Sequence, residues 1–338
     1  MRCLALADRL RERGALCQFI SRALPGAATD VISRAGYNLT FLPILAGQAT
    51  KSGVDWEQDA EETIAILKSW RPHWLIIDHY AFDFRWEDAV RTVGTKFMVI
   101  DDLADRPHSV DILLDQNLGR LSSDYDKLLP MAATRLIGPR FALLRPQFAQ
   151  FRSESLARRA QPALGHVMIA MGGADALNST GQLLEVLAKT RLPNDILVTV
   201  VLGATAPHLA KVRVQAEAMP FAVTVRSDIT EMACLMAEAD LAIGASGGTA
   251  WERSCLGLPS LILVLAANQR PGAHALAEAG AALFLGEIDD NRWKARLMNI
   301  LQGGQIRDAL EAMSQRTRSI TDGCGCDRVV TELLDSIE

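Results

Sequence analysis

Two hydrophobic periods alternate along the chain. Short apolar runs, typical of buried parallel strands, are separated by stretches whose apolar residues recur every three or four positions, as in amphipathic helices. In the first half, this pattern predicts helices over 1–13 and 55–70, and strands over 15–20, 73–77 and 96–100. Strands separated by helices of about 10–15 residues indicate parallel pairing through right-handed crossovers.

A second series of the same kind follows a polar stretch at 145–165. Its predicted strands cover 166–171, 196–202, 221–225, 240–243 and 260–265, and its predicted helices cover 176–190, 207–218, 229–239, 249–256 and 270–279. The chain therefore predicts an α/β protein in two halves, with ligands at the carboxyl ends of the strands and a cleft between the halves. The expected divisions are an N-terminal α/β domain at 1–145, a linker at 146–165, a C-terminal α/β domain at 166–322 and a C-terminal helix at 323–338.

The sequence opens on a helix rather than a strand. In an alternating series the first helix follows a strand, and Met1 has no preceding Ser, Thr, Asp or Asn to cap the helix amides. We therefore expect the first strand of the N-terminal sheet and its turn to be missing from this sequence. The alternative is a domain that simply begins with a helix.

Composition and charge narrow the class of protein. The 338 residues are 49% hydrophobic and 22% charged, as in ordinary two-domain globular proteins. The longest apolar run, 261–267, is far shorter than the roughly 20 residues needed to span a bilayer. A net charge of −5 indicates no basic surface for nucleic acid or anionic lipid. We expect a cytoplasmic monomer that binds neither nucleic acid nor membrane.

The cysteines and histidines do not form a recognisable metal or redox motif. The only close pair among six cysteines, Cys324 and Cys326, has one intervening residue, whereas common zinc and redox motifs have two. The six histidines show no metal-binding spacing, and no G-x-S-x-G motif is present. We expect reduced thiols, no metal, no cofactor and no nucleophilic catalysis.

Two Gly-rich turns, each between a predicted strand and a predicted helix, indicate a phosphate site. The first contains Gly172 and Gly173, and the second comprises Ser246, Gly247, Gly248 and Thr249. Glycines let the backbone approach a ligand closely, and the free amides of the following helix attract an anion. Either turn alone is compatible with an ordinary tight connection. Together they predict a site for one diphosphate.

Polar residues close to strand ends are further candidates. Glu252, one turn inside its helix, is placed to accept hydrogen bonds from a ribose diol, although a solvated helix glutamate fits equally well. His79 and Tyr80 come just after the predicted strand at 73–77. His79 is a candidate general base or substrate contact, unless it only forms part of a turn. Asn268 and Gln269 offer neutral donors and acceptors to sugar hydroxyls, unless they form an ordinary turn.

A set of motifs resembles one family. In order, they are IIDHY (76–80), IDD (100–102), DILLDQN (111–117), GPRFALLRPQF (138–148), MGGAD (171–175), ASGGTAWE (245–252) and NQ (268–269). They are similar, over nearly the whole chain, to the UDP-2,4-diacetamido-2,4,6-trideoxy-β-L-altropyranose hydrolases of pseudaminic acid biosynthesis. The resemblance implies a GT-B-like fold, with two Rossmann-like domains facing a cleft.

The resemblance also implies the reaction and the residues. Water attacks the anomeric carbon without a metal, and UDP and the free diacetamido sugar are released. The residues implied near the diphosphate are Gly172, Gly173, Ser246 and Gly247. Glu252 is implied at the uridine ribose, Asn268 at the phosphate or sugar, and His79 and Tyr80 in the sugar pocket.

One departure from the family changes the expectation for activity. Family members carry a strand and an I-G-x-G-H turn before the helix that reads MRCLALA, and the histidine of that turn is their general base. The resemblance implies that strand, turn and base are absent here, through an internal start or a truncation, which leaves His79 as a candidate base. The alternatives are a UDP-sugar glycosyltransferase of the same fold and a catalytically inactive UDP-sugar binding protein.

Overall fold

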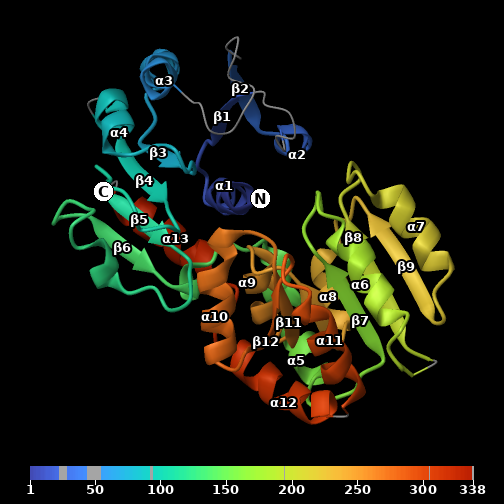
Figure 1. The fold of residues 1–338 in the computed structure, drawn as a ribbon. Coiled ribbons are helices and arrows are strands. Elements are labelled where there is room, and N and C mark those ends of the chain that lie inside the picture. The colour runs from blue at the N-terminus through green and yellow to red at the C-terminus, as the bar shows by residue number, and fades with distance from the viewer. Residues whose placement is uncertain (23–28, 44–54, 92–93, 194, 304, 337–338) are drawn as a thin grey trace. The chain divides into compact units, whose positions relative to one another are not determined.

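The structure is a computed structural model that describes residues 1–22, 29–43, 55–91, 94–193, 195–303 and 305–336. The chain forms two compact units, drawn in Figure 1. Unit 1 comprises Met1–Leu143 and Gly325–Glu338, and unit 2 comprises Leu144–Cys324. In the described residues, every strand pairing in both units is parallel, as the alternation of strands and helices predicts.

Unit 1 contains two separate sheets in its described residues. Its strands are β1 (Gln18–Arg22), β2 (Asn38–Leu42), β3 (Trp74–Ile77), β4 (Lys96–Ile100), β5 (Ile112–Asp115) and β6 (Thr134–Ile137). Its helices are α1 (Arg2–Glu12), α2 (Thr29–Arg34), α3 (Trp56–Trp70), α4 (Phe84–Val90) and α13 (Gly325–Asp335), with 3₁₀ turns η1 (Ser122–Tyr125) and η2 (Pro139–Phe141). One sheet has the order β3-β4-β5-β6, and β1 and β2 form a pair of their own (Figure 1).

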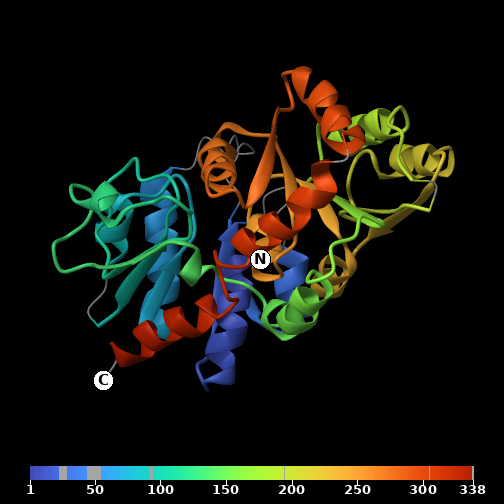
Figure 2. The ribbon, with the colours of Figure 1, turned by 90° about the horizontal axis from the view of Figure 1, so that it is seen from below.

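Helix α1 contributes to the core beneath both sheets of unit 1. Leu6 and Leu10 pack in one cluster with the buried residues of β4 and β5, whereas Leu4 joins a second cluster with residues around β1. Helix α13 comes from the far end of the chain and lies beside α1 (Figure 2). Its Val330 and Leu333 are almost fully buried in the same core as Leu6, so the C-terminal helix is an integral part of unit 1.

Unit 2 is built around one central sheet. Its strands are β7 (His166–Ala170), β8 (Leu197–Leu202), β9 (Ala222–Ser227), β10 (Leu241–Gly244), β11 (Ser260–Val264) and β12 (Ala282–Glu287). Its helices are α5 (Pro146–Arg158), α6 (Ser179–Leu187), α7 (Leu209–Glu217), α8 (Met232–Glu238), α9 (Thr249–Cys255), α10 (Arg270–Glu278), α11 (Arg292–Gln302) and α12 (Gln305–Thr317), with the 3₁₀ turn η3 (Ala267–Gln269). The strand order is β12-β11-β10-β7-β8-β9.

This order places the first strand of unit 2 in the middle of its sheet. The chain adds β8 and β9 on one side of β7, then crosses over and adds β10, β11 and β12 on the other. The point of reversal lies between β7 and β10, and open α/β sheets bind their ligands at such a switch point. The sheet is covered by apolar residues of α6, α7, α11 and α12, which share one core with the strands.

Several elements differ from the sequence predictions. The linker expected at 146–165 is largely helix α5, which begins at Pro146, where proline costs no hydrogen bond, and which buries Phe148 completely. The strand predicted at 15–20 lies at 18–22. The predicted C-terminal helix is α13, and residues 337–338 lie outside the described residues. Elements that the pattern did not predict are α2, α4, α11, α12, β2, β5, β6 and β12.

Within the described residues, no helix combines the length and the apolar character needed to cross a bilayer.

Candidate functional site

Three turns leave neighbouring strands at the switch point of unit 2. Ala170 of β7 pairs with Gly244 of β10, so the turns at 171–175 and 245–249 begin next to each other. Gly244 also pairs with Ile262 of β11, so the segment at 265–269 leaves the same edge of the sheet. The two predicted Gly-rich turns are therefore adjacent, as a shared phosphate site requires.

The first turn presents open backbone. Gly172 and Gly173 are exposed, and a Cβ atom on either would meet no atom of the described part of the chain within 4 Å. The buried Asp175 carboxylate accepts hydrogen bonds from the amides of Ser179 (2.8 Å) and Thr180 (2.9 Å). Asp175 thus satisfies part of the N-terminus of α6, which leaves the glycine backbone as the part of this turn that is open to a ligand.

The second turn is held in place by a buried arginine. Arg253 is fully buried and donates to the carbonyl of Ala245 (2.8 Å) and to the hydroxyl of Thr249 (3.3 Å). Burial lowers the pKa of Arg253 to about 10, so the group stays protonated at neutral pH. Gly247 and Gly248 are exposed, and among the described residues no atom lies within 4 Å of a Cβ placed on either and no side chain caps α9. Arg253 therefore fixes the buried side of this turn, whereas its glycines leave the exposed side open to a ligand.

Glu252 lies one turn inside α9. Its side chain is 17% exposed, and the nearest cationic group, Nη2 of Arg145, is 3.9 Å from Oε1. Burial raises the pKa of Glu252 to about 7, because the weak attraction of Arg145 does not offset the loss of hydration. No described residue donates a hydrogen bond to this carboxylate in the structure. Glu252 is therefore a mostly buried hydrogen-bond acceptor whose carboxylate oxygens are free to accept bonds from a ligand with two neighbouring hydroxyl groups.

Three further candidates lie at this edge of the sheet: Ser246 in the second Gly-rich turn, and Asn268 and Gln269 in the segment at 265–269. Asn268 is exposed in η3 and available to a ligand, whereas Oε1 of Gln269 accepts a hydrogen bond from the amide of Leu265 (3.0 Å). A Cβ atom on Gly272 would approach the hydroxyl oxygen of Ser246 to 3.2 Å, so the first turn of α10 lies against the second Gly-rich turn. The three residues therefore lie at the same edge of the sheet, as the sequence predicts. The side-chain oxygen of Gln269, however, is already used in a hydrogen bond within the protein.

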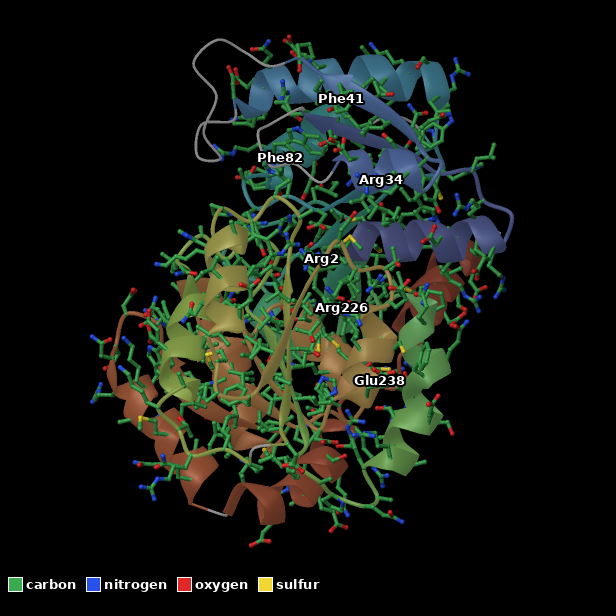
Figure 3. The ribbon with its side chains drawn as sticks, turned by 90° about the vertical axis from the view of Figure 1, so that its right-hand side faces the viewer. Arg2, Arg34, Phe41, Phe82, Arg226 and Glu238 are labelled. Carbon is green, nitrogen blue, oxygen red and sulfur yellow. The ribbon has the colours of Figure 1, made fainter. Side chains whose placement is uncertain are left out.

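A second polar cluster lies in unit 1, at the carboxyl ends of β3 and β4. Arg2 donates to Asp78 from Nε (3.0 Å) and Nη2 (2.7 Å), and to Asp102 from Nη1 (3.2 Å). Tyr80, 52% exposed, donates its hydroxyl to Asp102 (3.1 Å). Although burial acts in the opposite direction, the bonds from Arg2 hold the pKa of Asp78 below its usual value. Figure 3 labels Arg2 on α1.

His79 belongs to the same cluster. It follows Asp78, and its ring stacks on Phe82 with 4.0 Å between ring centroids. The structure therefore groups the sequence candidates by unit: His79 and Tyr80 in unit 1, and the remaining candidates in unit 2.

Sequence reasoning did not select four residues that organise these clusters: Arg2, Arg145, Asp175 and Arg253. Asp175 and Arg145 lie inside motifs that the sequence displays, MGGAD and GPRFALLRPQF, so their positions were a usable signal. Arg253 had no such signal, because its full burial depends on how α9 packs. Among the described residues, no group of three or more His, Cys, Asp or Glu side chains is placed to hold a metal ion.

Sequence comparison identifies this chain as a distant homologue of two bacterial proteins. It is 28% identical over 204 residues to the spore coat polysaccharide biosynthesis protein SpsG of Bacillus subtilis, covering 60% of this chain and 58% of that protein. It is 30% identical over 153 residues to the UDP-2,4-diacetamido-2,4,6-trideoxy-β-L-altropyranose hydrolase of Campylobacter jejuni, covering 45% and 52%. The chain thus spans about half of the length of the curated relatives it matches. No family model matches.

Comparison with solved structures shows the fold. MurG of Acinetobacter baumannii aligns with a TM-score of 0.71 at 15% identity, covering 99% of this chain and 95% of that protein. UGT89C1 of Arabidopsis thaliana, solved with UDP, aligns with a TM-score of 0.65 at 14% identity, covering 98% and 95%. The chain has the GT-B-like fold expected from the sequence, with two parallel-sheet α/β units.

Proposed function

We propose that this protein hydrolyses UDP-2,4-diacetamido-2,4,6-trideoxy-β-L-altropyranose to UDP and the free diacetamido sugar, in the pathway to pseudaminic acid. Water attacks the anomeric carbon, the bond from that carbon to the diphosphate oxygen breaks, and UDP leaves with the electron pair. The attacking water loses a proton to solvent or to a basic group. The Campylobacter jejuni relative is named as the hydrolase of this UDP-sugar.

The observation that carries the nucleotide half of this proposal is the adjacency of the two open Gly-rich turns in unit 2. In the proposal, the backbone at Gly172, Gly173, Gly247 and Gly248 binds the diphosphate, together with Ser246 and Thr249. Glu252 accepts hydrogen bonds from the ribose hydroxyls, and Asn268 and Gln269 lie at the phosphate or sugar. The supporting facts are the open space at the glycines and the unused acceptor capacity of Glu252.

In the proposal, the sugar is contacted by His79 and Tyr80 of unit 1. Both side chains lie at the carboxyl ends of parallel strands, which is where α/β folds recognise ligands. Tyr80 is half exposed although its hydroxyl is oriented by Asp102, an arrangement suited to a polar ligand.

A second candidate function is glycosyl transfer from a UDP-sugar to a hydroxyl acceptor. It is favoured by the fold, since the aligned structures include the glycosyltransferase SsfS6 of Streptomyces sp. SF2575. The GT-B-like scaffold supports several chemistries, so the fold does not choose between water and an acceptor. A third candidate is a UDP-sugar binding protein without turnover.

The deciding experiment follows this chain with the diacetamido UDP-sugar by ³¹P and ¹H NMR. Hydrolysis predicts equal amounts of UDP and free sugar in buffer alone, and no reaction with UDP-N-acetylglucosamine. Release of UDP only when a hydroxyl acceptor is present would identify a transferase. Binding without any release would identify the inactive binding protein, and a chain that binds no UDP-sugar would contradict the whole proposal.

A further inference from the structure

The ring of His79 is held rigidly on one face. It stacks on Phe82 at 4.0 Å with an interplanar angle of 25°, and Phe82 stacks on Trp86 at 4.4 Å with an angle of 4°. The indole N–H of Trp86 donates to Asp59 (3.0 Å), which anchors the far end of this stack. Figure 3 labels Phe82 in unit 1. The stack fixes the plane in which the two ring nitrogens of His79 lie.

The two ring nitrogens have different surroundings. The backbone amide of Ala81 donates a hydrogen bond to Nδ1 of His79 at 3.2 Å. A nitrogen that accepts a hydrogen bond carries no proton of its own, so the proton of the neutral ring is on Nε2. Among the described residues, Nε2 has no hydrogen-bond partner in the structure. The ring therefore offers one N–H donor and no free lone pair.

Arg106 fixes the backbone that carries this ring. Its Nε donates to the carbonyl of Phe82 (2.8 Å), and its Nη2 donates to the carbonyl of His79 (3.4 Å). Arg106 is itself paired with the buried Asp101 carboxylate, with Nη1 at 2.9 Å from Oδ1. The turn from 79 to 82 is thus tied to the end of β4, and this support holds the amide of Ala81 within hydrogen-bond distance of the His79 ring.

The charge state of His79 agrees with this geometry. Burial lowers the pKa of His79 below its usual value. Asp59 and Asp78 act in the opposite direction, and Arg106 and Arg22 act in the same direction as burial. The ring is therefore neutral at pH 7, in the form that carries its single proton on Nε2.

We propose that His79 is a fixed hydrogen-bond donor that directs Nε2–H at an acceptor oxygen of the bound UDP-sugar, and that it is not the general base. A general base must present a free lone pair to the proton it removes, and the basic nitrogen of this ring is occupied by the amide of Ala81. The ligand in this proposal rests on the proposed function. The class of acceptor is a carbonyl, hydroxyl or phosphate oxygen.

The tautomer is measured first, because it needs no substrate. In the intact chain labelled with ¹⁵N-histidine, the signals of His79 are those that disappear in H79N. We expect a neutral ring at pH 7 with a protonated Nε2 and an unprotonated Nδ1. A ring with the proton on Nδ1 would overturn the proposal, whatever the protein does to UDP-sugars.

The same signals locate the acceptor. Addition of UDP alone, followed by the UDP-sugar, tests nucleotide and sugar oxygens in turn. A shift of the Nε2–H signal with both ligands assigns an oxygen of the nucleotide, and a shift with the UDP-sugar alone assigns a sugar oxygen. A UDP-sugar that is bound, as judged by calorimetry, but leaves this signal unchanged would contradict the donor role. A chain that binds no UDP-sugar contradicts the proposed function, and the donor role with it, whatever the tautomer.

Two substitutions separate a donor from a base. The amide nitrogen of glutamine reaches the position of Nε2, whereas that of asparagine reaches only the position of Nδ1. For a donor, H79Q keeps kcat/KM within about tenfold of wild type, while H79N loses about 10- to 100-fold. For a base, both lose about 10²–10⁴-fold, which would overturn the proposal. The exposed His73 provides the matched control, and H73Q keeps the wild-type rate.

Discussion

At the level of single residues, the ionised carboxylate of Glu252 is expected to favour UDP binding and to lower the stability of the folded protein. Its carboxylate is buried enough to raise the pKa to about 7, from an ordinary value of 4.5. In the proposed function, the ionised form accepts the ribose hydroxyls. We expect UDP to bind about tenfold more weakly for each pH unit below 7, down to the limit set by the protonated form. Calorimetry between pH 5.5 and 8.5 measures this dependence, and E252Q removes it.

The same residue predicts an opposite effect on folding. The folded state holds the Glu252 proton up to a higher pH than the unfolded state, so this group makes stability fall as pH rises from about 4.5 to about 7. Replacing it with glutamine removes that loss. At pH 8, E252Q should be about 1–3 kcal/mol more stable to urea than wild type, while binding UDP less tightly. An E252Q protein that is less stable at pH 8, or that binds UDP as tightly, contradicts this account.

At the level of elements, the start of α6 depends on the carboxylate of Asp175. This residue has a φ of 38° and accepts bonds from two amides of α6. Substituting alanine removes the cap and leaves a β-carbon at this φ without the hydrogen bonds that support the aspartate there. D175G is the matched variant, because glycine adopts this φ without strain. We expect D175G to lose about 1 kcal/mol by urea unfolding and D175A to lose more. A D175A protein as stable as wild type would show that the cap contributes nothing.

The elements also show how far sequence reasoning reaches. The central strands of unit 2 were predicted, because runs such as HVMIAM and SLILVL are apolar on both faces and are followed within three residues by glycine or a polar residue. Strands β5 and β6 were missed, since each is four residues long and has no helical stretch of clear period beside it. Helix α5 was missed because its apolar positions are few, and tertiary burial of Phe148 rather than sequence period defines it.

For the candidate site residues too, positions could be predicted from the sequence, whereas contacts that form only in the fold could not. The glycines and polar residues could be placed at strand ends from the sequence, because the carboxyl end of a parallel strand can be recognised from the apolar run before it. The roles of Arg253 and Gln269 depend on atoms that meet only in the fold, namely the carbonyl of Ala245 and the amide of Leu265. Sequence reasoning therefore located the edge of the sheet, and the structure separated exposed groups from groups with structural partners.

At the level of the whole molecule, unit 2 is one continuous segment, whereas unit 1 is closed by the return of α13. Leu333 is 1% exposed in the core that α13 shares with α1. L333A should destabilise unit 1 by about 2–5 kcal/mol, because it leaves a cavity in a packed core. Differential scanning calorimetry checks this, with L121A, at an exposed position of the same unit, as the control. An unchanged thermogram for L333A would contradict the assignment of α13 to this core.

The two units should also respond differently to nucleotide. Each has its own hydrophobic core, and the proposed UDP contacts all lie in unit 2. UDP at about 100 times its Kd stabilises the unit that binds it by about 2.7 kcal/mol. In L333A, where unit 1 melts first, UDP should raise only the later transition, and E252Q in the same background should reduce that rise. A single transition that moves as a whole with UDP would mean that the units unfold together. A shift of the earlier transition alone would place the nucleotide in unit 1 and contradict the proposed site.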